Sequence, residues 1–368
     1  MSWLLFAAAL FLAYSNGAND NFKGVATLFG TGTANYKRSL TVATLSTLAG
    51  SICSIFLAAE LVKNFSGRGL IPDALLSTHT FTAVAVGAAL TVMLATRIGM
   101  PVSTTHGLVG GLVGAGLSAG VSLNLAKLGG TFVLPLIASP LIAACISLAV
   151  FSIVTYLKRD RRIPDDPCIC TEADWMASPI NADAAVAAEH GTRLRTGARA
   201  QCESAGAQVV ATISLPGVVD ALHYFSAGAV SFARGLNDTP KIAGLILLSQ
   251  GLPIRYGMLL LALSIAIGGA LNARRVAETM SKKITTLTRV QGLSANLVTA
   301  LLVGTASWNG LPVSTTHVSV GSIFGMGVAT KSANPKVISE ILLSWVLTLP
   351  LAAAVTGLVY FVLGHITQ

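Results

Sequence analysis

Long apolar spans follow one another along almost the whole chain, and this pattern constrains the fold more than any other feature of the sequence. Only 11% of the residues are charged, against about 25% in an average soluble domain, so a soluble globule would lack polar surface. The mean hydropathy is +0.72. We therefore predict an all-α integral membrane protein with about 10–12 transmembrane helices. The spans cover residues 2–33, 40–62, 79–97, 101–120, 130–157, 207–234, 236–250, 255–273, 285–307, 311–329 and 337–364.

The first span begins "MSWLLFAAALFLAYSNGAND". It lacks the basic start and the small-residue cleavage site of a signal peptide, so we expect it to remain as the first membrane helix. The span is too long for one straight helix, and it contains polar residues and Gly17. A helix break is expected there, and another near Gly235, where the sequence is similar.

Two motifs occur twice, in the same order, in the two halves of the chain. "PVSTTH" stands at 101–106 and again at 312–317, and "SNGANDNFKGVA" from Ser15 resembles "ARGLNDTPKIAG" from Ala233. A repeat of this kind indicates gene duplication. It predicts an N-terminal membrane repeat at 1–157, a hydrophilic linker at 158–206 and a C-terminal membrane repeat at 207–368.

Positive charge predicts the orientation of the chain in the cell inner membrane. Loops rich in lysine and arginine remain on the cytoplasmic side, which places both termini outside and the linker in the cytoplasm. Each half then crosses the membrane an odd number of times, so the two repeats are inverted; Lys63 and Arg68 on the outer side run against this trend. Inverted repeats with broken helices are typical of secondary transporters, whose sites lie near the midplane. The basic residues used are Lys37, Arg38, the 158–162 cluster, Arg274, Arg275, Lys282, Lys283, Lys331 and Lys336.

Each PVSTTH motif predicts a helix N-terminus with hydroxyl groups on it. Proline suits the first helical turn, and the backbone N–H groups that follow are free to bind an anion. Two such tips brought face to face could surround one tetrahedral oxyanion, which explains why the motif is duplicated. Helix capping combined with close packing is the simpler alternative. The residues expected to bind the anion are Ser103, Thr104, Thr105, Ser314, Thr315 and Thr316.

The Asn-Asp pairs are the second candidate element of a site. A carboxylate inside a membrane span costs about 2.5–3.5 kcal/mol on insertion scales, so it is a functional candidate by default. Carboxylate and amide oxygens suit Na⁺, and a carboxylate can also accept a proton. Lys23 and Lys241 follow one turn later, where they could neutralise the aspartates, face the anion or form a structural pair. The predicted cation site consists of Asn19, Asp20, Asn237 and Asp238.

His106 and His317 end the two PVSTTH motifs and are supporting candidates. A Ser-x-x-His spacing would suit a membrane hydrolase, but no acid that could orient the histidine is evident in the sequence. We therefore expect that the protein is not an enzyme, and that each histidine packs at the site or donates to a neighbour. Arg97 has no counterpart in the second repeat and is expected to anchor its helix at the membrane surface.

The five cysteines fall into two groups. Cys53 and Cys145 lie in apolar spans and are predicted to be small core residues. Cys168, Cys170 and Cys202 lie in and near the polar segment, where reduced thiols are expected, because no histidine pattern completes a metal site. The linker itself has mixed charges and scattered prolines, which favours a mobile segment; a regulatory binding role is the alternative.

The paired motifs together resemble the inorganic phosphate transporter (PiT) family, in particular its bacterial members. The resemblance rests on "GAND" at 17–20, "GLND" at 235–238, both PVSTTH motifs and "RRVAETM" at 274–280. It implies a symporter that imports phosphate together with a cation, Na⁺ in preference to H⁺. The six hydroxyl residues would contact the anion, and the Asn-Asp pairs would contact the cation. A homodimer is implied as well, and neither a cofactor nor a nucleic-acid partner is expected.

Two departures from the family pattern leave the cation and its stoichiometry open. The stretch "ATLSTLAGS" has hydroxyls where the family often has an acidic residue, and the second motif reads "RGLNDTPK" instead of "GANDVANA". A permease for sulfate or another oxyanion is the nearest alternative, and a channel is a further one.

Overall fold

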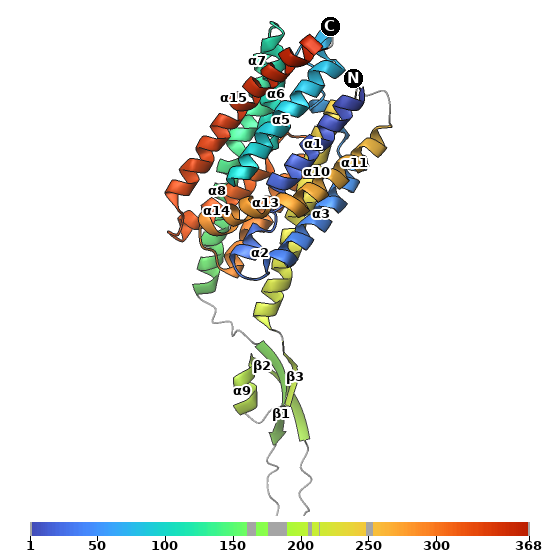
Figure 1. Ribbon diagram of the computed structural model, residues 1–368. Coiled ribbons are helices and arrows are strands. Elements are labelled where there is room, and N and C mark those ends of the chain that lie inside the picture. Colours follow the sequence, from blue (N-terminus) through green and yellow to red (C-terminus); the bar gives the residue numbers. More distant parts are fainter. Residues whose placement is uncertain are drawn as a thin grey trace, which may run out of the picture. The chain divides into compact units, whose positions relative to one another are not determined.

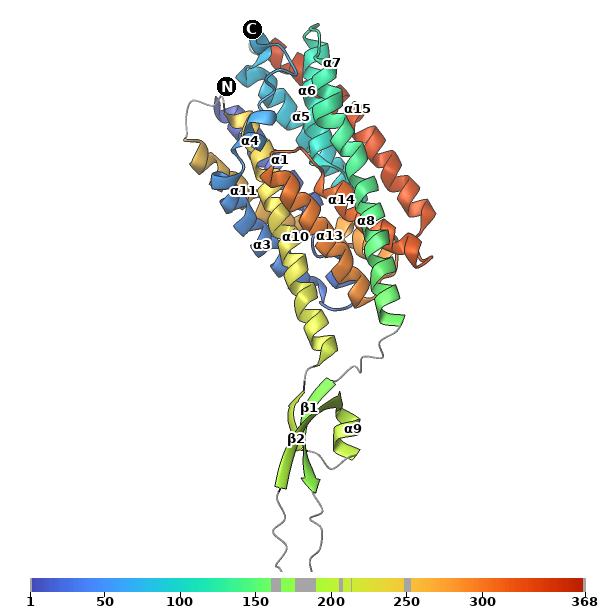
Figure 2. The same cartoon turned by 180° about the vertical axis from the view of Figure 1, so that it is seen from behind.

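The computed structural model describes residues 2–159, 167–175, 190–204, 208–212, 214–247 and 253–366 (Figures 1 and 2). The chain forms two compact units. Unit 1 contains residues 1–152 and 223–368, and unit 2 contains residues 153–222.

Unit 1 is built from helices of both halves of the chain. The first half contributes α1 (Ser2–Asp20), α2 (Ala26–Gly30), α3 (Tyr36–Leu57), α4 (Ala59–Asn64), η1 (Asp73–Leu75), α5 (Thr78–Ile98), α6 (Thr104–Ser118), α7 (Leu125–Lys127), η2 (Leu128–Val133) and α8 (Leu134–Arg159). The second half contributes α10 (Leu215–Ile246), α11 (Ile254–Asn272), α12 (Arg274–Glu278), η3 (Thr279–Lys283), α13 (Arg289–Trp308), α14 (Thr315–Ala329) and α15 (Pro335–Ile366). Helices α8 and α10 also run into unit 2.

The helix boundaries repeat between the halves as the motifs do. Helix α6 has 15 residues and so does α14, and each begins directly after the serine of its PVSTTH motif. Helix α5 has 21 residues and its counterpart α13 has 20. Both termini of unit 1 lie at one end, and the opposite end is where α8 leaves and α10 enters (Figures 1 and 2). This placement agrees with an odd number of crossings in each half.

Six helices in the described part of the chain are long and apolar enough to span a membrane. Helices α6 and α14 are shorter: 15 residues at 1.5 Å per residue reach about 22 Å, less than the ~30 Å of a hydrocarbon core. They are therefore half-helices, and their hydroxyl-bearing tips end inside the bundle. Together with α1, which ends at the first Asn-Asp motif, these half-helices supply the broken-helix architecture expected from the sequence.

The two repeats are interlocked through glycine. A Cβ at Gly114 of α6 would collide with the backbone of Ala353 on α15, and one at Gly325 of α14 would collide with Ala144 on α8. Each half-helix therefore packs at backbone contact against a long helix of the other repeat. Contacts between the halves make them one compact unit, and the repeat boundaries at 157 and 207 remain predictions.

The two Asn-Asp helices differ in shape. Helix α1 ends at Asp20 and is followed by a turn before α2, as the sequence predicts. The predicted break near Gly235 is wrong, because α10 runs without interruption from Leu215 to Ile246. Gly235 provides close packing there instead: a Cβ would collide with Thr47 on α3. The spans predicted at 207–234 and 236–250 therefore merge into one helix, with 248–250 outside the described residues.

Large apolar side chains cover the outside of unit 1. Phe56, Leu343 and Phe361 are 58–72% exposed, which suits helices surrounded by lipid. The same arrangement corrects the prediction for Cys145, which is exposed on α8, whereas Cys53 is half-buried. A membrane helix turns apolar residues to lipid as well as to the core, so an apolar span does not imply burial.

Unit 2 is a small antiparallel sheet with one short helix. It contains β1 (Pro167–Trp175), β2 (His190–Ala198), α9 (Arg199–Ser204) and β3 (Gln208–Thr212), with strand order β2-β1-β3. The apolar span predicted from residue 207 is wrong at its start, because 208–212 pairs with β1 as a strand. The described linker thus contains ordered elements; the rest of the predicted 158–206 segment, such as 176–189, lies outside the described residues.

Candidate functional site

The two PVSTTH tips adopt the same geometry. Ser103 Oγ accepts the backbone N–H of His106 at 3.3 Å, and Ser314 Oγ accepts that of His317 at 3.3 Å. Both serines have N-cap backbone torsions, near φ −97° and ψ 117°. Helix capping therefore accounts for the serine hydroxyls. All six predicted anion-binding residues are buried: Ser103, Thr104, Thr105, Ser314, Thr315 and Thr316.

The ammonium group of Lys23 lies in a cage of oxygen atoms. Its Nζ contacts Asp20 Oδ1 and Thr316 Oγ1 and donates to the Val102 carbonyl at 2.8 Å. Lys23 and Asp20 are 1% and 2% exposed, so this ion pair is out of contact with bulk water. Among the alternatives raised by the sequence, the lysine neutralises the aspartate.

Lys241 occupies the equivalent cage in the second repeat. Its Nζ lies 3.5 Å from Asp238 Oδ1, donates to the Val313 carbonyl at 2.6 Å and donates to Thr105 Oγ1 at 3.0 Å. Each lysine therefore combines a carboxylate and a carbonyl of its own repeat with a threonine hydroxyl of the other. These bonds link the two tips across the centre of the unit.

Asn16 and Arg234 join the two aspartates. Asn16 Nδ2 lies 3.1 Å from Asp20 Oδ2 and 3.2 Å from Asp238 Oδ2. Arg234 Nη2 donates to Asn16 Oδ1 at 2.7 Å, and its Nε lies 3.4 Å from Asp238 Oδ2. Asn16 also donates to Thr104 Oγ1 at 2.9 Å. One amide thus contacts both carboxylates and one of the hydroxyl groups.

The sequence prediction missed Arg234 and Asn16. The signal was present: the alignment that pairs Asn19 with Asn237 also places Arg234 opposite Asn16, one helical turn before Asp238. Arg234 is 0% exposed in the structure. An arginine inside an apolar span, next to a repeated carboxylate motif, is the sequence pattern that could have identified it.

The described centre of unit 1 carries an excess of positive charge. Two carboxylates, Asp20 and Asp238, face three cationic side chains, Lys23, Lys241 and Arg234, all of them at most 4% exposed. Burying an uncompensated charge is expensive, so a site of this kind is suited to a bound counter-ion. The balance favours an anion.

The asparagines of the Asn-Asp pairs hold the segments that lead into the tips. Asn19 Oδ1 accepts the Val102 N–H at 3.1 Å, and its Nδ2 donates to the Met100 carbonyl at 3.0 Å. Asn237 Nδ2 donates to the Val313 carbonyl at 3.2 Å. Both asparagines therefore position the carbonyls that the lysines use. Their predicted contact with a cation stays a prediction.

His106 and His317 lie side by side, with ring centroids 4.7 Å apart. His317 Nδ1 lies 2.8 Å from the Leu136 carbonyl of α8, and its ring stacks on Trp345 of α15 at 3.8 Å. In the described part of the chain, His106 Nδ1 and His317 Nε2 have no hydrogen-bond partner. Both rings line an apolar cavity of about 420 Å³ between α8, α14 and α15. They pack beside the tips, and the hydroxyl of Ser103 serves the cap.

A basic crevice of about 980 Å³ lies against α1, α5, α11 and α12. Arg97, Arg274 and Arg275 line it, and so does Thr96, whose hydroxyl accepts from Asn19 at 3.0 Å. Arg97 is exposed, and its predicted role as an anchor at the membrane surface stays a prediction. The crevice is therefore lined both by exposed arginines and by Thr96, a side chain that contacts the site.

Interlocked repeats with half-helix tips facing a buried, positively charged centre define a multi-pass membrane transporter. Comparison with known sequences assigns the family: residues 16–356 match the phosphate transporter family (PHO4). The chain belongs to this family, and the resemblance inferred from the paired motifs is confirmed.

Named proteins match this chain over almost its whole length. The chain is 29% identical over 400 residues to a putative phosphate permease of Thermococcus kodakarensis, covering 98% of both. It is 27% identical over 378 residues to a probable low-affinity inorganic phosphate transporter of Rhizobium meliloti, covering 97% of this chain and 95% of that one. Among solved structures, a sodium-dependent phosphate transporter matches with a TM-score of 0.76, 22% identity and 99% coverage of both chains. That likeness establishes the fold.

Proposed function

We propose that this protein imports inorganic phosphate by cation symport, through alternating access between its two repeats. The family membership supports phosphate as the substrate. The observation that carries the proposal is the buried excess of one positive charge between two hydroxyl-bearing helix tips. Helix N-termini and hydroxyl donors from both sides suit a tetrahedral oxyanion.

Phosphate binding would use groups that now hold the tips together. Lys23 contacts Thr316 and Lys241 contacts Thr105, so each bond joins one repeat to the other. A phosphate between the tips would accept from these same hydroxyls and from the two ammonium groups. When phosphate binds, the hydrogen bonds between the two tips would be replaced by hydrogen bonds to phosphate. The two repeats could then move relative to each other.

The lysine cages favour a proton as the coupling cation. A carboxylate, a carbonyl and a hydroxyl oxygen are the ligands that Na⁺ would use, and in both cages an ammonium group already occupies the position. Charge balance agrees: H₂PO₄⁻ neutralises the excess positive charge, and HPO₄²⁻ does so once Asp20 or Asp238 takes up one proton. An uncompensated charge would meet about 2.3 kcal/mol per 100 mV of membrane potential. The resemblance seen in the sequence favours Na⁺ as the cation, and the solved structural neighbour is named a sodium-dependent phosphate transporter. Na⁺ is therefore the alternative to the proton.

Uptake of labelled phosphate into proteoliposomes tests both levels of the proposal. An inward proton gradient without sodium should drive accumulation, and a sodium gradient at equal pH should not. Accumulation driven by sodium alone would overturn the proton assignment while leaving symport intact. Saturation without any gradient dependence would indicate a uniporter, and a linear, unsaturable flux would indicate a channel.

Sulfate is the competing substrate of the same geometry. A tenfold excess of sulfate should leave phosphate uptake unchanged if the site selects a protonated oxyanion. The carboxylates of Asp20 and Asp238 can accept a hydrogen bond from a proton on phosphate, and sulfate has no such proton to donate. Equal competition would favour a general oxyanion permease.

The position of the protein in the cell also belongs to the proposal. We place it in the cell inner membrane with both termini outside and the 158–206 linker in the cytoplasm, on the basis of the lysine and arginine distribution. We also propose a homodimer, by analogy with the family. A reporter fused to the C-terminus that is active only outside the cytoplasm would support this orientation, and one that is active only inside would reverse it.

A further inference from the structure

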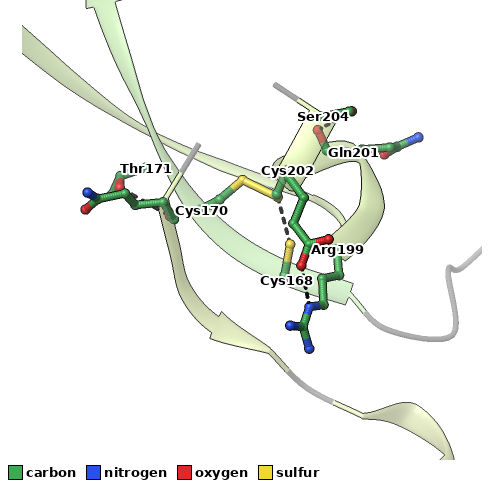
Figure 3. Close-up of a disulfide and its surroundings, with 9 residues drawn as sticks. Cys168, Cys170, Thr171, Arg199, Gln201, Cys202 and Ser204 are labelled. Carbon is green, nitrogen blue, oxygen red and sulfur yellow. Dashed lines mark hydrogen bonds and ion pairs between the residues drawn. A yellow bond between two sulfur atoms is a disulfide. The ribbon is translucent and has the colours of Figure 1, made fainter. Parts of the chain in front are cut away.

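Three buried cysteines meet inside unit 2. Cys168 and Cys170 are two residues apart on the central strand β1, so their side chains lie on one face of the sheet, and Cys202 lies on α9 (Figure 3). Cys170 and Cys202 form a disulfide. Cys168 Sγ lies 2.7 Å from Cys202 Sγ, and all three sulfur atoms lie within 4.8 Å of one another.

The disulfide does not account for the third sulfur. Cys168 is 2% exposed and points to the other two, so strand and helix bring three sulfurs to one point where a disulfide needs two. Three convergent sulfurs are the ligand set of a thiophilic metal ion such as Zn²⁺ or Cu⁺. Around a metal with metal–sulfur bonds of ~2.3 Å the sulfurs would stand about 4 Å apart. The observed cluster is within reach of that spacing by side-chain rotation.

The size of unit 2 supports a cross-linking role for this cluster. Its buried cluster of apolar residues consists, within the described ranges, of the three cysteines alone. Ile169, Leu194 and Val210 on the strands are 38–73% exposed. A sheet of three short strands with so small a core needs a covalent or metal cross-link to hold together.

We propose that unit 2 holds a thiophilic metal ion on Cys168, Cys170 and Cys202 when the disulfide is reduced. Reduction by a dithiol transfers two electrons and two protons to Cys170 and Cys202 and leaves the dithiol oxidised. The metal ion then replaces the protons of the three thiols. No fourth histidine, cysteine, aspartate or glutamate joins the group among the described residues, so water or another small ligand completes the coordination.

The expected compartment favours the metal-bound state. In the cytoplasm thiols are kept reduced, and clustered cysteines there more often bind metal than form disulfides. This step rests on the orientation proposed above. Metal binding by the purified protein is independent of transport, so its failure and a failure of phosphate uptake can be told apart.

The test uses the full chain in detergent, reduced with a phosphine, freed of metal and titrated with Zn²⁺ against a chromophoric chelator. We expect one zinc per chain, and with Cd²⁺ a thiolate-to-metal absorption band in the ultraviolet. Cys168→Ser, Cys170→Ser and Cys202→Ser should each weaken zinc binding more than about 100-fold, since loss of an outer-shell partner alone costs about 10–100-fold. A Cys53→Ser, Cys145→Ser double variant is the matched control and should bind normally.

Alkylation of the wild-type chain provides a second measurement that does not depend on a variant folding. Zinc should protect Cys168, Cys170 and Cys202 from iodoacetamide and leave the reactivity of Cys145 on α8 unchanged. Absence of stoichiometric zinc, together with alkylation of Cys168, Cys170 and Cys202 that zinc does not change, would overturn the proposal and leave a structural disulfide. Equal loss of binding in the control variant would overturn it as well. A Cu⁺ titration read by the same protection distinguishes which ion binds more tightly.

Discussion

The two PVSTTH tips share their backbone geometry, while the two repeats differ in the charge that they place at the centre. The tips of α6 and α14 begin with the same capping bonds, and both lysines bind the same three kinds of oxygen. At the aligned position one helical turn before each aspartate, the first half has Asn16 and the second has Arg234. The repeat therefore supplies a symmetric frame for the anion, and a single asymmetric residue gives that frame its excess positive charge.

The aspartates should show the largest effect. Asp20→Asn and Asp238→Asn are each expected to abolish coupled phosphate uptake in proteoliposomes while the protein still inserts, since both leave buried cations without a partner. Breaking a buried pair in this way costs about 3–5 kcal/mol. Asp238 pairs with both Arg234 and Lys241, so thermal unfolding in detergent should reveal the greater loss of stability for Asp238→Asn. Uptake by Asp20→Asn at the wild-type rate would remove that residue from the mechanism.

Arg234 offers the sharpest test of the asymmetry. Arg234→Asn should weaken phosphate binding about 100-fold or more, because it removes the excess positive charge and leaves Asp238 with one cation. Adding Asn16→Arg moves the charge to the mirrored position and should recover at least about tenfold of that loss. Binding is measured from the concentration dependence of uptake.

If Arg234→Asn binds phosphate normally, the asymmetry has no part in the substrate site. If the double variant remains as weak as the single one, the position of the guanidinium matters and not only its charge.

The paired threonines should behave alike. Thr105→Val and Thr316→Val each remove a hydroxyl that a lysine contacts, and hydrogen bonds to charged groups contribute about 1.5–3 kcal/mol. Uptake should fall roughly tenfold or more in each, with the two variants within a factor of about three. Thr305→Val, exposed on α13, is the matched control. A large effect in one variant only would show that phosphate contacts one tip.

The capping serines should have the smallest effect. Ser103→Ala and Ser314→Ala remove matching caps and should each lower the free energy of unfolding by about 0.5–2 kcal/mol. Denaturant or thermal melts in detergent measure this, with the exposed Ser152→Ala as control. A loss of phosphate affinity much larger than the loss of stability would assign the hydroxyls to the substrate as well.

Local sequence accounts for much of the fold and for most of the residues that meet at its centre, although Arg234 and Asn16 were missed. The apolar spans, the half-helices after PVSTTH and the break after Asp20 are properties of neighbouring residues, and they could be predicted. The uninterrupted α10 could not, because Gly235 is held helical by packing against α3. The strand at 208–212 was also missed, since a short apolar run pairs as a strand only when a partner such as β1 is present.

The sequence by itself determined that this chain lies in a membrane, that it is a duplication and that it belongs to a phosphate transporter family. These follow from hydropathy and repeated motifs, which short-range chemistry encodes. Only the tertiary structure decided that Lys23 contacts Thr316, 293 residues away, that Arg234 joins Asn16 across 218 residues, and that three cysteines of unit 2 share one point. Such contacts depend on how the helices and strands pack, and no local pattern in the chain specifies them.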